Sequence, residues 1–251
     1  MKIFSTMTLR LSAAAVFFMV MMTHAAYAAA SEPVNITTGD RSISAGKNCA
    51  ILEDRTGNLT LNSVISDEYS GQFRLSKTGT PNFGFTSSVY WVKLPLANMS
   101  GKTLDRLLEV SFPQLDLVEF HLLDKDSNLV SYEASGRNYA FRKRSIRHRN
   151  CVFHMRIPHN ETMTAYLKIS TEDGMIFPLT LWSPYAFLTG SQTENFLFGI
   201  FYGIILVMIF YNLFIYLSTR NRHYIFYVLF ISSFGLFQLC MNGLASQYLW
   251  P

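Results

Sequence analysis

Ser-Val-Tyr-Trp-Val-Lys-Leu-Pro-Leu, residues 88–96, is the stretch that decides the fold. Apolar side chains recur at every second position, which is the period of a β-strand. One face of the predicted strand carries Tyr90, Val92, Leu94 and Leu96. The other face carries Val89, Trp91 and Lys93.

Similar short apolar runs, separated by turn residues, lie on both sides of this strand. We predict further strands at residues 108–112, 118–122, 151–157, 165–169 and 176–181, and one that begins at residues 58–61. Pro113 and Pro158 end two of these runs. No helical period separates the runs, so we expect an antiparallel β-sandwich in one domain over residues 31–190.

The C-terminal part has a different composition. Residues 196–217 and 224–245 are two uncharged apolar runs of about 22 residues each, long enough as helices to span roughly 33 Å. The short loop between them contains Arg220, Arg222 and His223. We predict two transmembrane helices, with this basic loop in the cytoplasm.

The N-terminus has the features of a secretory signal peptide. Lys2 and Arg10 precede an apolar run at residues 11–22, and Ala26-Tyr27-Ala28 follows as a small-residue cleavage site. We predict a signal peptide over residues 1–28. Export of the following domain agrees with the cytoplasmic basic loop, so we expect a bacterial inner-membrane protein with its β domain in the periplasm.

The charge distribution indicates a membrane protein. The chain of 251 residues is 49% hydrophobic and has a net charge of +4. Residues 31–193 are nearly balanced, with 17 basic and 16 acidic residues. The excess flanks the three apolar segments, so we expect membrane lipid as a partner and no nucleic acid.

Patterns that carry catalytic chemistry are missing from the sequence. There is no H-E-x-x-H, G-x-S-x-G, C-x-x-C or G-x-G-x-x-G. Gly101-Lys102-Thr103 resembles the end of a phosphate-binding loop, but the required preceding glycine is replaced by Leu96. His148, His154 and His159 are not at metal-ligand spacing. We expect neither an enzyme nor a metal or other cofactor.

Two cysteines, Cys49 and Cys151, fall in the domain expected in an oxidising compartment. They could form a disulfide, or they could be two separate buried thiols. Both alternatives are open at this point.

A basic stretch offers the candidate ligand site. Residues 137–149 contain six Arg or Lys side chains, interleaved with aromatic residues. Such a loop could grip an anionic or sugar-like ligand, lie on lipid head groups, or be solvated with one or two structural arginines. Trp91 could be a core residue or a stacking platform for a sugar. The candidate ligand-binding residues are Trp91, Arg137, Tyr139 and Arg144.

The first apolar run contains residues suited to helix packing. Gly199 and Gly203 form a G-x-x-x-G pair, which allows another helix to approach closely, within the same protein or in a dimer. Asn212 is a polar group at membrane depth and requires a partner. We therefore expect partner helices or a separate signalling protein.

Several short motifs resemble one family in their order along the chain. They are Val89-Tyr90-Trp91-Val92-Lys93; Gly136 with Phe141 and Arg144; Tyr211-Asn212-Leu213-Phe214; and Gly243 with Gln247-Tyr248-Leu249-Trp250-Pro251. The chain resembles the bacterial seven-transmembrane receptors with diverse intracellular signalling modules, the 7TMR-DISM family. Residues 51–182 resemble its type 2 extracellular domain, and the following residues resemble its first two membrane helices.

The resemblance implies a jelly-roll-like sensor domain with a carbohydrate as candidate ligand, followed by seven helices and a cytoplasmic output module. This sequence has two candidate helices and no output module. We therefore expect the input region of a signal-transduction receptor, truncated before its remaining helices. The alternative is a two-helix membrane tether that presents a protein-docking domain to a separate partner.

Overall fold

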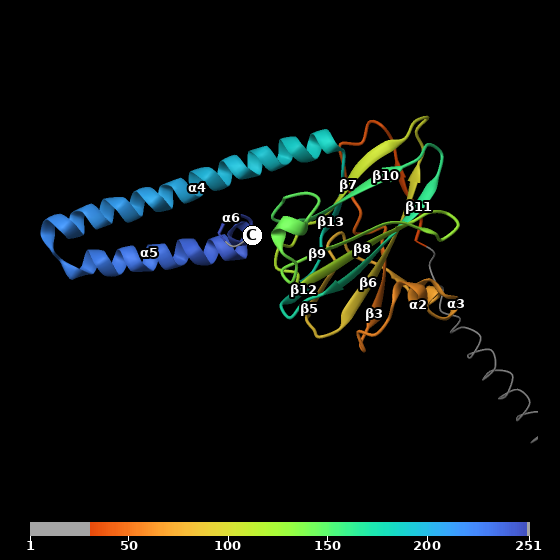
Figure 1. Cartoon of the computed structure of the whole chain (residues 1–251), viewed down its shortest axis with the longest axis horizontal. Coiled ribbons are helices and arrows are strands. Elements are labelled where there is room, and N and C mark those ends of the chain that lie inside the picture. Colours follow the sequence, from red (N-terminus) through yellow and green to blue (C-terminus); the bar gives the residue numbers. More distant parts are fainter. Residues whose placement is uncertain (1–30, 250–251) are drawn as a thin grey trace, which may run out of the picture.

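The computed structural model describes residues 31–249, which form a β domain and a helical hairpin (Figure 1). The signal peptide predicted at residues 1–28 lies outside the described residues. The strands are β1 (Val34–Ile36), β2 (Ser42–Ser44), β3 (Ala50–Asp54), β4 (Arg74–Leu75), β5 (Asn82–Phe85), β6 (Val89–Asn98), β7 (Leu104–Val110), β8 (Leu117–Leu123), β9 (Leu129–Ser135), β10 (Cys151–Ile157), β11 (Thr162–Ser170), β12 (Gly174–Ile176) and β13 (Leu179–Trp182). The helices are α2 (Leu61–Ile65), α3 (Asp67–Ser70), the 3-10 helix η1 (Phe141–Lys143), α4 (Pro184–Thr219), α5 (Arg222–Met241) and α6 (Leu244–Tyr248).

Two sheets form the β domain. The larger has seven strands in the order β4-β3-β6-β11-β8-β9, with β1 also paired to β6. The smaller has the order β10-β7-β13-β2, and β12 pairs separately with β5. The pairing is antiparallel throughout residues 31–249 except between β1 and β6, which are parallel. The predicted mainly antiparallel β fold is confirmed.

The core lies between the two sheets and is built by the alternation seen in the sequence. The inward face of β6, from Tyr90 to Leu96, is buried, as is the inward face of β11. Phe120 of the larger sheet stacks on Phe153 of the smaller one, with ring centroids 4.9 Å apart. A period of two in the sequence therefore predicted both the strands and their buried faces.

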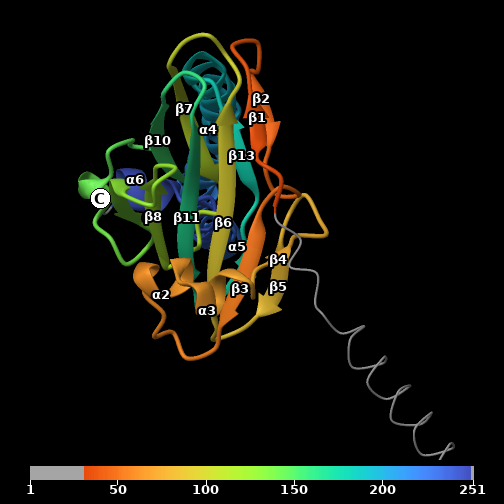
Figure 2. The same ribbon diagram turned by 90° about the vertical axis from the view of Figure 1, so that its right-hand side faces the viewer.

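A second apolar layer covers the outer face of β3 and β6. Figure 2 shows α2 and α3 in front of one end of this sheet. Trp91, Leu52, Val64 of α2 and Phe73 belong to one buried apolar cluster. The expectation of a strand beginning at residues 58–61, and of no helix between strands, was wrong. Thr60 caps α2 by accepting a hydrogen bond from the Ser63 N–H at 3.3 Å, and this local bond favours a helical turn.

The helical hairpin begins earlier than predicted. Ser183 is the N-cap of α4 and Pro184 occupies its first turn, so the helix starts inside the predicted 31–190 domain. Its 36 residues span about 54 Å. α5 ends at Met241, before the predicted 245, because Gly243 adopts a left-handed conformation and starts α6. α4 and α5 are both long and apolar enough to cross a membrane, which confirms the two predicted helices.

Contacts within the hairpin involve other residues than those expected. The close approach of α4 and α5 is at Gly235, where a methyl group would lie 3.1 Å from Ile205 Cγ2. A methyl group on Gly199 or Gly203 would meet nothing within 4 Å among the described residues. Asn212 is buried and donates to the Met208 carbonyl at 2.8 Å, so its partner lies in its own helix.

The two cysteines of the β domain are separate buried thiols rather than a disulfide. Cys49 lies just before β3, and its thiol donates to the Gly46 carbonyl at 3.1 Å. Cys151 begins β10 in the opposite sheet. Of the two alternatives, the structure adopts the one in which both residues act as apolar core side chains.

Candidate functional site

The β domain meets the hairpin in two contact regions, and the first lies where α4 leaves the smaller sheet (Figure 1). β13 ends at Trp182 and α4 begins at Pro184, so no flexible linker separates sheet and helix. Phe187 is buried in the first turns of α4 and packs against Leu107 and Val152 of the sheet. Burial of an aromatic ring fixes the direction in which the helix leaves the domain.

Polar contacts complete this first region. Glu109 is only 7% exposed and accepts hydrogen bonds from Asn150 Nδ2 at 2.6 Å and Trp182 Nε1 at 2.8 Å. Arg149 forms an ion pair of 2.9 Å with Glu194 on α4. Because two N–H groups donate to the buried carboxylate, hydrogen bonds stabilise it in place of water. The first turns of α4 therefore form one unit with the β domain.

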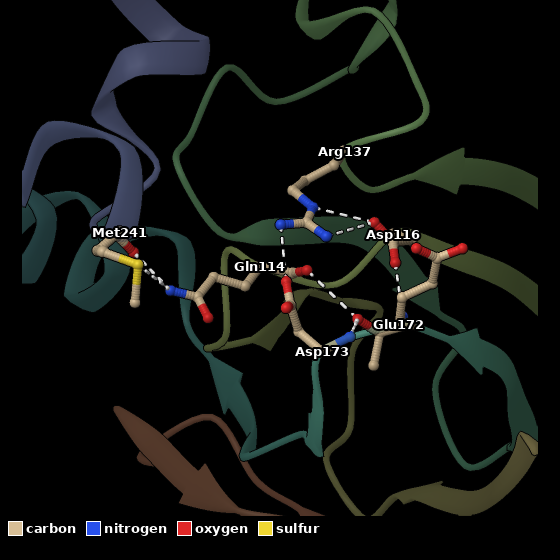
Figure 3. Close-up of polar contacts among 7 residues, drawn as sticks. Gln114, Asp116, Arg137, Glu172, Asp173 and Met241 are labelled. Carbon is tan, nitrogen blue, oxygen red and sulfur yellow. Dashed lines mark hydrogen bonds and ion pairs between the residues drawn. The ribbon is translucent and has the colours of Figure 1, made fainter. Parts of the chain in front are cut away.

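The second contact region joins a loop of the β domain to the end of α5. Gln114 Nε2 donates to the Met241 carbonyl at 3.4 Å and lies 3.1 Å from its sulfur (Figure 3). Gly243 has a φ of 72°, and a methyl group there would lie 2.6 Å from Pro113 Cβ. Only a glycine satisfies both conditions, so the loop and the α5–α6 turn are in direct contact.

An ion-pair network lies next to Gln114. Arg137 pairs with Asp116 at 2.8 Å and with Asp173 at 2.7 Å. Asp116 also accepts from the Glu172 N–H at 2.8 Å, and Thr171 donates weakly to the Gln114 carbonyl at 3.5 Å (Figure 3). The network therefore joins three loops that are far apart in the sequence.

The electrostatics of the network favour a charged Asp116. Burial alone would raise the pKa of Asp116, but the Glu172 N–H and the Arg137 guanidinium outweigh it and lower the pKa below its ordinary value. Arg137 in turn has its charge matched by two carboxylates. It is therefore already saturated with anionic partners.

A cleft of about 690 Å³ opens beside this network. The side chains that line it offer hydroxyl, amide and carboxylate groups and one aromatic ring, and none is basic. They are Phe85, Thr86, Ser87, Asp116, Asn138, Ser170, Thr171 and Glu172. Phe85 is 87% exposed, so its ring is available for stacking. An aromatic face beside donors and acceptors suits a polyhydroxylated ligand.

The structure does not gather the four predicted ligand residues into one site. Trp91 is 1% exposed beneath α2, and a ring so buried offers no face to a sugar. Arg144 is also buried and donates to the carbonyls of Gly136 and His148 at 3.1 and 3.0 Å. Arg137 lies in the network above, and Tyr139 is half-buried in the following turn. Of these four residues, only Arg137 contacts the lining of the cleft, because it pairs with Asp116.

Sequence reasoning missed most of the cleft. Phe85 ends strand β5, whereas Asn138 and Glu172 come from two separate loops, and none of the three belongs to a recognisable motif. The one usable signal was Asn-Phe-Gly-Phe at residues 82–85, where two aromatic residues flank a glycine. Nor do the described residues contain a group of three His, Cys, Asp or Glu that could hold a metal ion.

Comparison with protein-family models identifies both parts of the chain. Residues 46–183 match the model described as 7TMR-DISM extracellular 2. Residues 194–251 match the model described as 7TM diverse intracellular signalling. The chain belongs to the 7TMR-DISM family. The family implies a membrane receptor with an extracellular sensor domain. The two matches confirm the resemblance found in the sequence.

Solved structures are similar to this 7TMR-DISM chain only remotely. A bacteriophage CBA120 tailspike protein 4 domain is 9% identical, over 41% of this chain and 15% of its own, with a TM-score of 0.26. A family GH115 4-O-methyl-alpha-glucuronidase is 12% identical, over 58% and 18%, with a TM-score of 0.29. An adhesin domain of Lys-gingipain from Porphyromonas gingivalis is 11% identical, over 41% and 69%, with a TM-score of 0.22. A comparison with curated protein sequences finds no match.

Two buried histidines should make the stability of the receptor depend on pH. Burial lowers the pKa of His121 below its ordinary value of 6.5, opposed by Glu119 and assisted by Lys168. Burial also lowers the pKa of His148, whose Nδ1 accepts from the Asn150 N–H at 3.2 Å. Since the folded state disfavours both protons, stability is fully present above pH 6.5 and is lost as the pH falls through the folded pKa values.

We expect the thermal unfolding midpoint of the full chain in detergent to fall by about 3–10 °C between about pH 7.5 and 5.5. His121→Phe with His148→Gln should remove most of this dependence. His159→Gln is the control, because His159 is exposed and its replacement should leave the profile unchanged. An equally steep profile in the double variant would assign the dependence to other groups.

Proposed function

We propose that the β domain is the periplasmic ligand-binding input of an inner-membrane signalling receptor, and that its ligand is a carbohydrate or similar polyhydroxylated molecule held in the Phe85 cleft. The observation that carries this proposal is the cleft itself, which combines an exposed aromatic ring with hydroxyl, amide and carboxylate groups. Sugars are bound by aromatic stacking on their apolar faces and by hydrogen bonds at their edges.

The charge of the cleft favours a neutral or amine-bearing ligand over an anionic one. Asp116 and Glu172 line it, whereas the nearest guanidinium, that of Arg137, is already paired with two carboxylates. An anionic ligand would have to approach these carboxylates without a free cation to compensate them. The anionic ligand considered from the sequence is therefore disfavoured at this position.

The contacts around Asp116 offer a route from the ligand to the membrane helices. A ligand that binds Asp116 or Glu172 competes with the bonds that hold the loops of Arg137 and Gln114. Gln114 contacts the end of α5, whereas α4 is fixed to the smaller sheet by Phe187. Differential binding to two arrangements of these loops would move α5 relative to α4, and further helices or a separate signalling protein would read that movement.

The orientation proposed for the receptor follows the distribution of charge. Arg220 lies between α4 and α5, and Arg222 and His223 begin α5. A short basic turn of this kind between two membrane helices remains in the cytoplasm. The β domain lies at the opposite end of both helices (Figure 1). This arrangement supports a periplasmic location for the cleft.

A second candidate function is a protein-docking domain tethered by the two helices. The observation that favours it is the edge strand β9, in which the side chains of Leu129, Val130 and Tyr132 are each more than half exposed. An edge strand with exposed apolar side chains is a surface for strand addition by another protein. In this function the Phe85 cleft would have no ligand.

A thermal-shift screen on the full chain in detergent separates the two functions. We expect stabilisation by members of a panel of neutral and amino sugars, and none by acidic sugars. Phe85→Ala and Asn138→Ala should each weaken the binding of a hit by roughly tenfold, because they remove the stacking face and the amide. Calorimetric titration of the purified variants measures this change.

Tyr185→Ala is the matched control, since Tyr185 is an exposed aromatic residue on α4 outside the cleft. The affinity of the Tyr185→Ala variant for the sugar should equal that of the unmodified chain. Unchanged binding in both cleft variants would remove the site. A panel without any hit, together with a protein partner lost on Tyr132→Asp, would favour the docking function.

A further inference from the structure

Three of the six cations in the basic stretch are free in the structure. Arg142, Lys143 and Arg147 are exposed. Among residues 31–249 none of them forms an ion pair. The other three of the stretch are engaged, as Arg137 pairs with carboxylates, Arg144 binds backbone carbonyls and Arg149 pairs with Glu194. The fold therefore separates structural arginines from a set of available positive charges.

The loop that carries these cations touches the helical hairpin. The Arg149 guanidinium lies 5.1 Å from the centre of the Phe198 ring of α4. A methyl group on Gly243 would lie 3.2 Å from the Arg149 carbonyl oxygen, so the loop also contacts the α5–α6 turn. Figure 1 shows this green loop beside α6, at the end of the β domain nearest the hairpin.

The length of α5 places this contact at the surface of a bilayer. Its 20 residues rise by about 30 Å, which equals the thickness of the hydrocarbon core. With its first residue, Arg222, at one boundary, Met241 lies at the other. Residues next to the α5–α6 turn are then in the layer of lipid head groups, which is several ångströms thick.

We propose that Arg142, Lys143 and Arg147 bind the head groups of anionic phospholipids in the leaflet on the β-domain side. Guanidinium and ammonium groups at this depth meet lipid phosphates, and Arg binds phosphate through two parallel hydrogen bonds. The nearby carboxylates do not neutralise the cluster. Glu133 accepts from the Ser145 backbone N–H at 3.1 Å, and Glu194 is occupied by Arg149.

The proposed lipid contact acts on the same loop that carries Arg137. Residues 137–149 begin with Arg137, which pairs with Asp116, and end with Arg149, which pairs with Glu194 of α4. Head groups that hold the middle of this loop would fix its position relative to both contact regions. The lipid surface would thereby hold the β domain in one orientation on the hairpin.

Native mass spectrometry of the full chain, released from nanodiscs, tests the proposal. The nanodiscs contain phosphatidylcholine with an equimolar amount of phosphatidylglycerol. We expect the chain to retain phosphatidylglycerol preferentially, and Arg142→Gln with Lys143→Gln and Arg147→Gln to lower this preference at least fivefold, since one cation near an anionic surface contributes roughly that factor. Arg142→Lys with Arg147→Lys should retain the preference.

The matched control removes three cations from the opposite end of the domain. Lys102, Lys125 and Arg156 are exposed and lie in or beside turns distant from the hairpin, so their replacement by Gln should leave retention unchanged. Equal retention in the test and control variants would overturn the proposal, as would equal loss in both. Displacement of the bound phosphatidylglycerol by inorganic phosphate would also overturn the proposal, because that result would indicate a site for the free anion. If the triple variant does not fold, an absence of salt dependence in the retention by the unmodified chain counts against the proposal.

Discussion

Gly136→Ala is expected to lower the free energy of unfolding of the receptor by about 3–5 kcal/mol. Gly136 has a φ of 123°, a region that residues with a Cβ rarely adopt. A methyl group there would overlap the carbonyl oxygen of Asp116 and press on the backbone of Leu117. Because the obstacle is backbone at the start of β8, it cannot move aside as a flexible side chain would.

The surrounding bonds leave the loop little freedom to relax around a methyl group. The Arg137 N–H donates to the Leu115 carbonyl at 2.9 Å, and the Asn138 N–H donates to the Asp116 carbonyl at 3.1 Å. The Gly136 carbonyl itself accepts from Arg144. A shift of Gly136 would strain or break all three hydrogen bonds. We therefore expect a loss of unfolding free energy larger than backbone strain alone would cause.

The thermal unfolding midpoint of the full chain in detergent measures the effect, and a fall of about 10 °C corresponds to it. Gly101→Ala is the control, because a methyl group on Gly101 would meet nothing within 4 Å and its φ is not positive. Equal midpoints for the two variants would show that the loop accommodates the methyl group. The two contact regions between the β domain and the hairpin would then be looser than their geometry indicates.

Long strands with regular alternation could be predicted from the sequence. The strands β6, β10 and β11 were all located within a few residues, because their side chains alternate over seven or more positions. The two membrane helices were found for a similar reason, since a run without charges is unambiguous in a chain of this composition. Such patterns are repeated many times and tolerate single exceptions.

Short elements and element ends could not be predicted in this way. α2 and α3 have five and four residues, too few to display a helical period. The start of α4 was missed although Ser183 and Pro184 form a typical helix start, because the uncharged run alone was used to find its boundary. A membrane helix that continues into a soluble domain has charged and polar residues in its first turns, as Glu194 shows here.

The role of each arginine could not be read from its position in the basic stretch. Arg142 and Arg144 are two residues apart, yet one is exposed and the other buried. What distinguishes them is the set of carbonyl groups that the folded loop turns toward Arg144. Trp91 presented the same difficulty, since it lies on the outer face of its sheet but is covered by α2. Both outcomes depend on neighbours that are distant in the sequence.

The three residues of one family motif contact each other in the structure. Arg144 lies with its guanidinium 5.0 Å from the centre of the Phe141 ring and donates to the Gly136 carbonyl at 3.1 Å. A second bond of 3.0 Å reaches the His148 carbonyl. The motif is thus a structural unit that folds the loop between both contact regions.

Arg144→Ala is therefore expected to destabilise the chain by about 3–4 kcal/mol. It leaves the His148 carbonyl without its donor, leaves the Gly136 carbonyl with the Tyr139 N–H alone, and removes the stack on Phe141. Arg144→Lys should lose about half as much, since a single ammonium cannot reproduce the fork that serves both carbonyls. Arg142→Ala, at an exposed position two residues away, should change stability by less than about 0.5 kcal/mol. Thermal unfolding of the three variants in detergent gives the ranking.

The same variants decide between a structural and a ligand-binding role for this arginine. If Arg144 held a ligand directly, its replacement by Ala would weaken ligand binding while the unfolding midpoint stayed near that of Arg142→Ala. The buried guanidinium, bonded only to backbone carbonyls of its own loop within the described residues, predicts the reverse order. Stability should fall first, and ligand affinity should follow only because the loop that carries Arg137 and Asn138 loses its fixed shape.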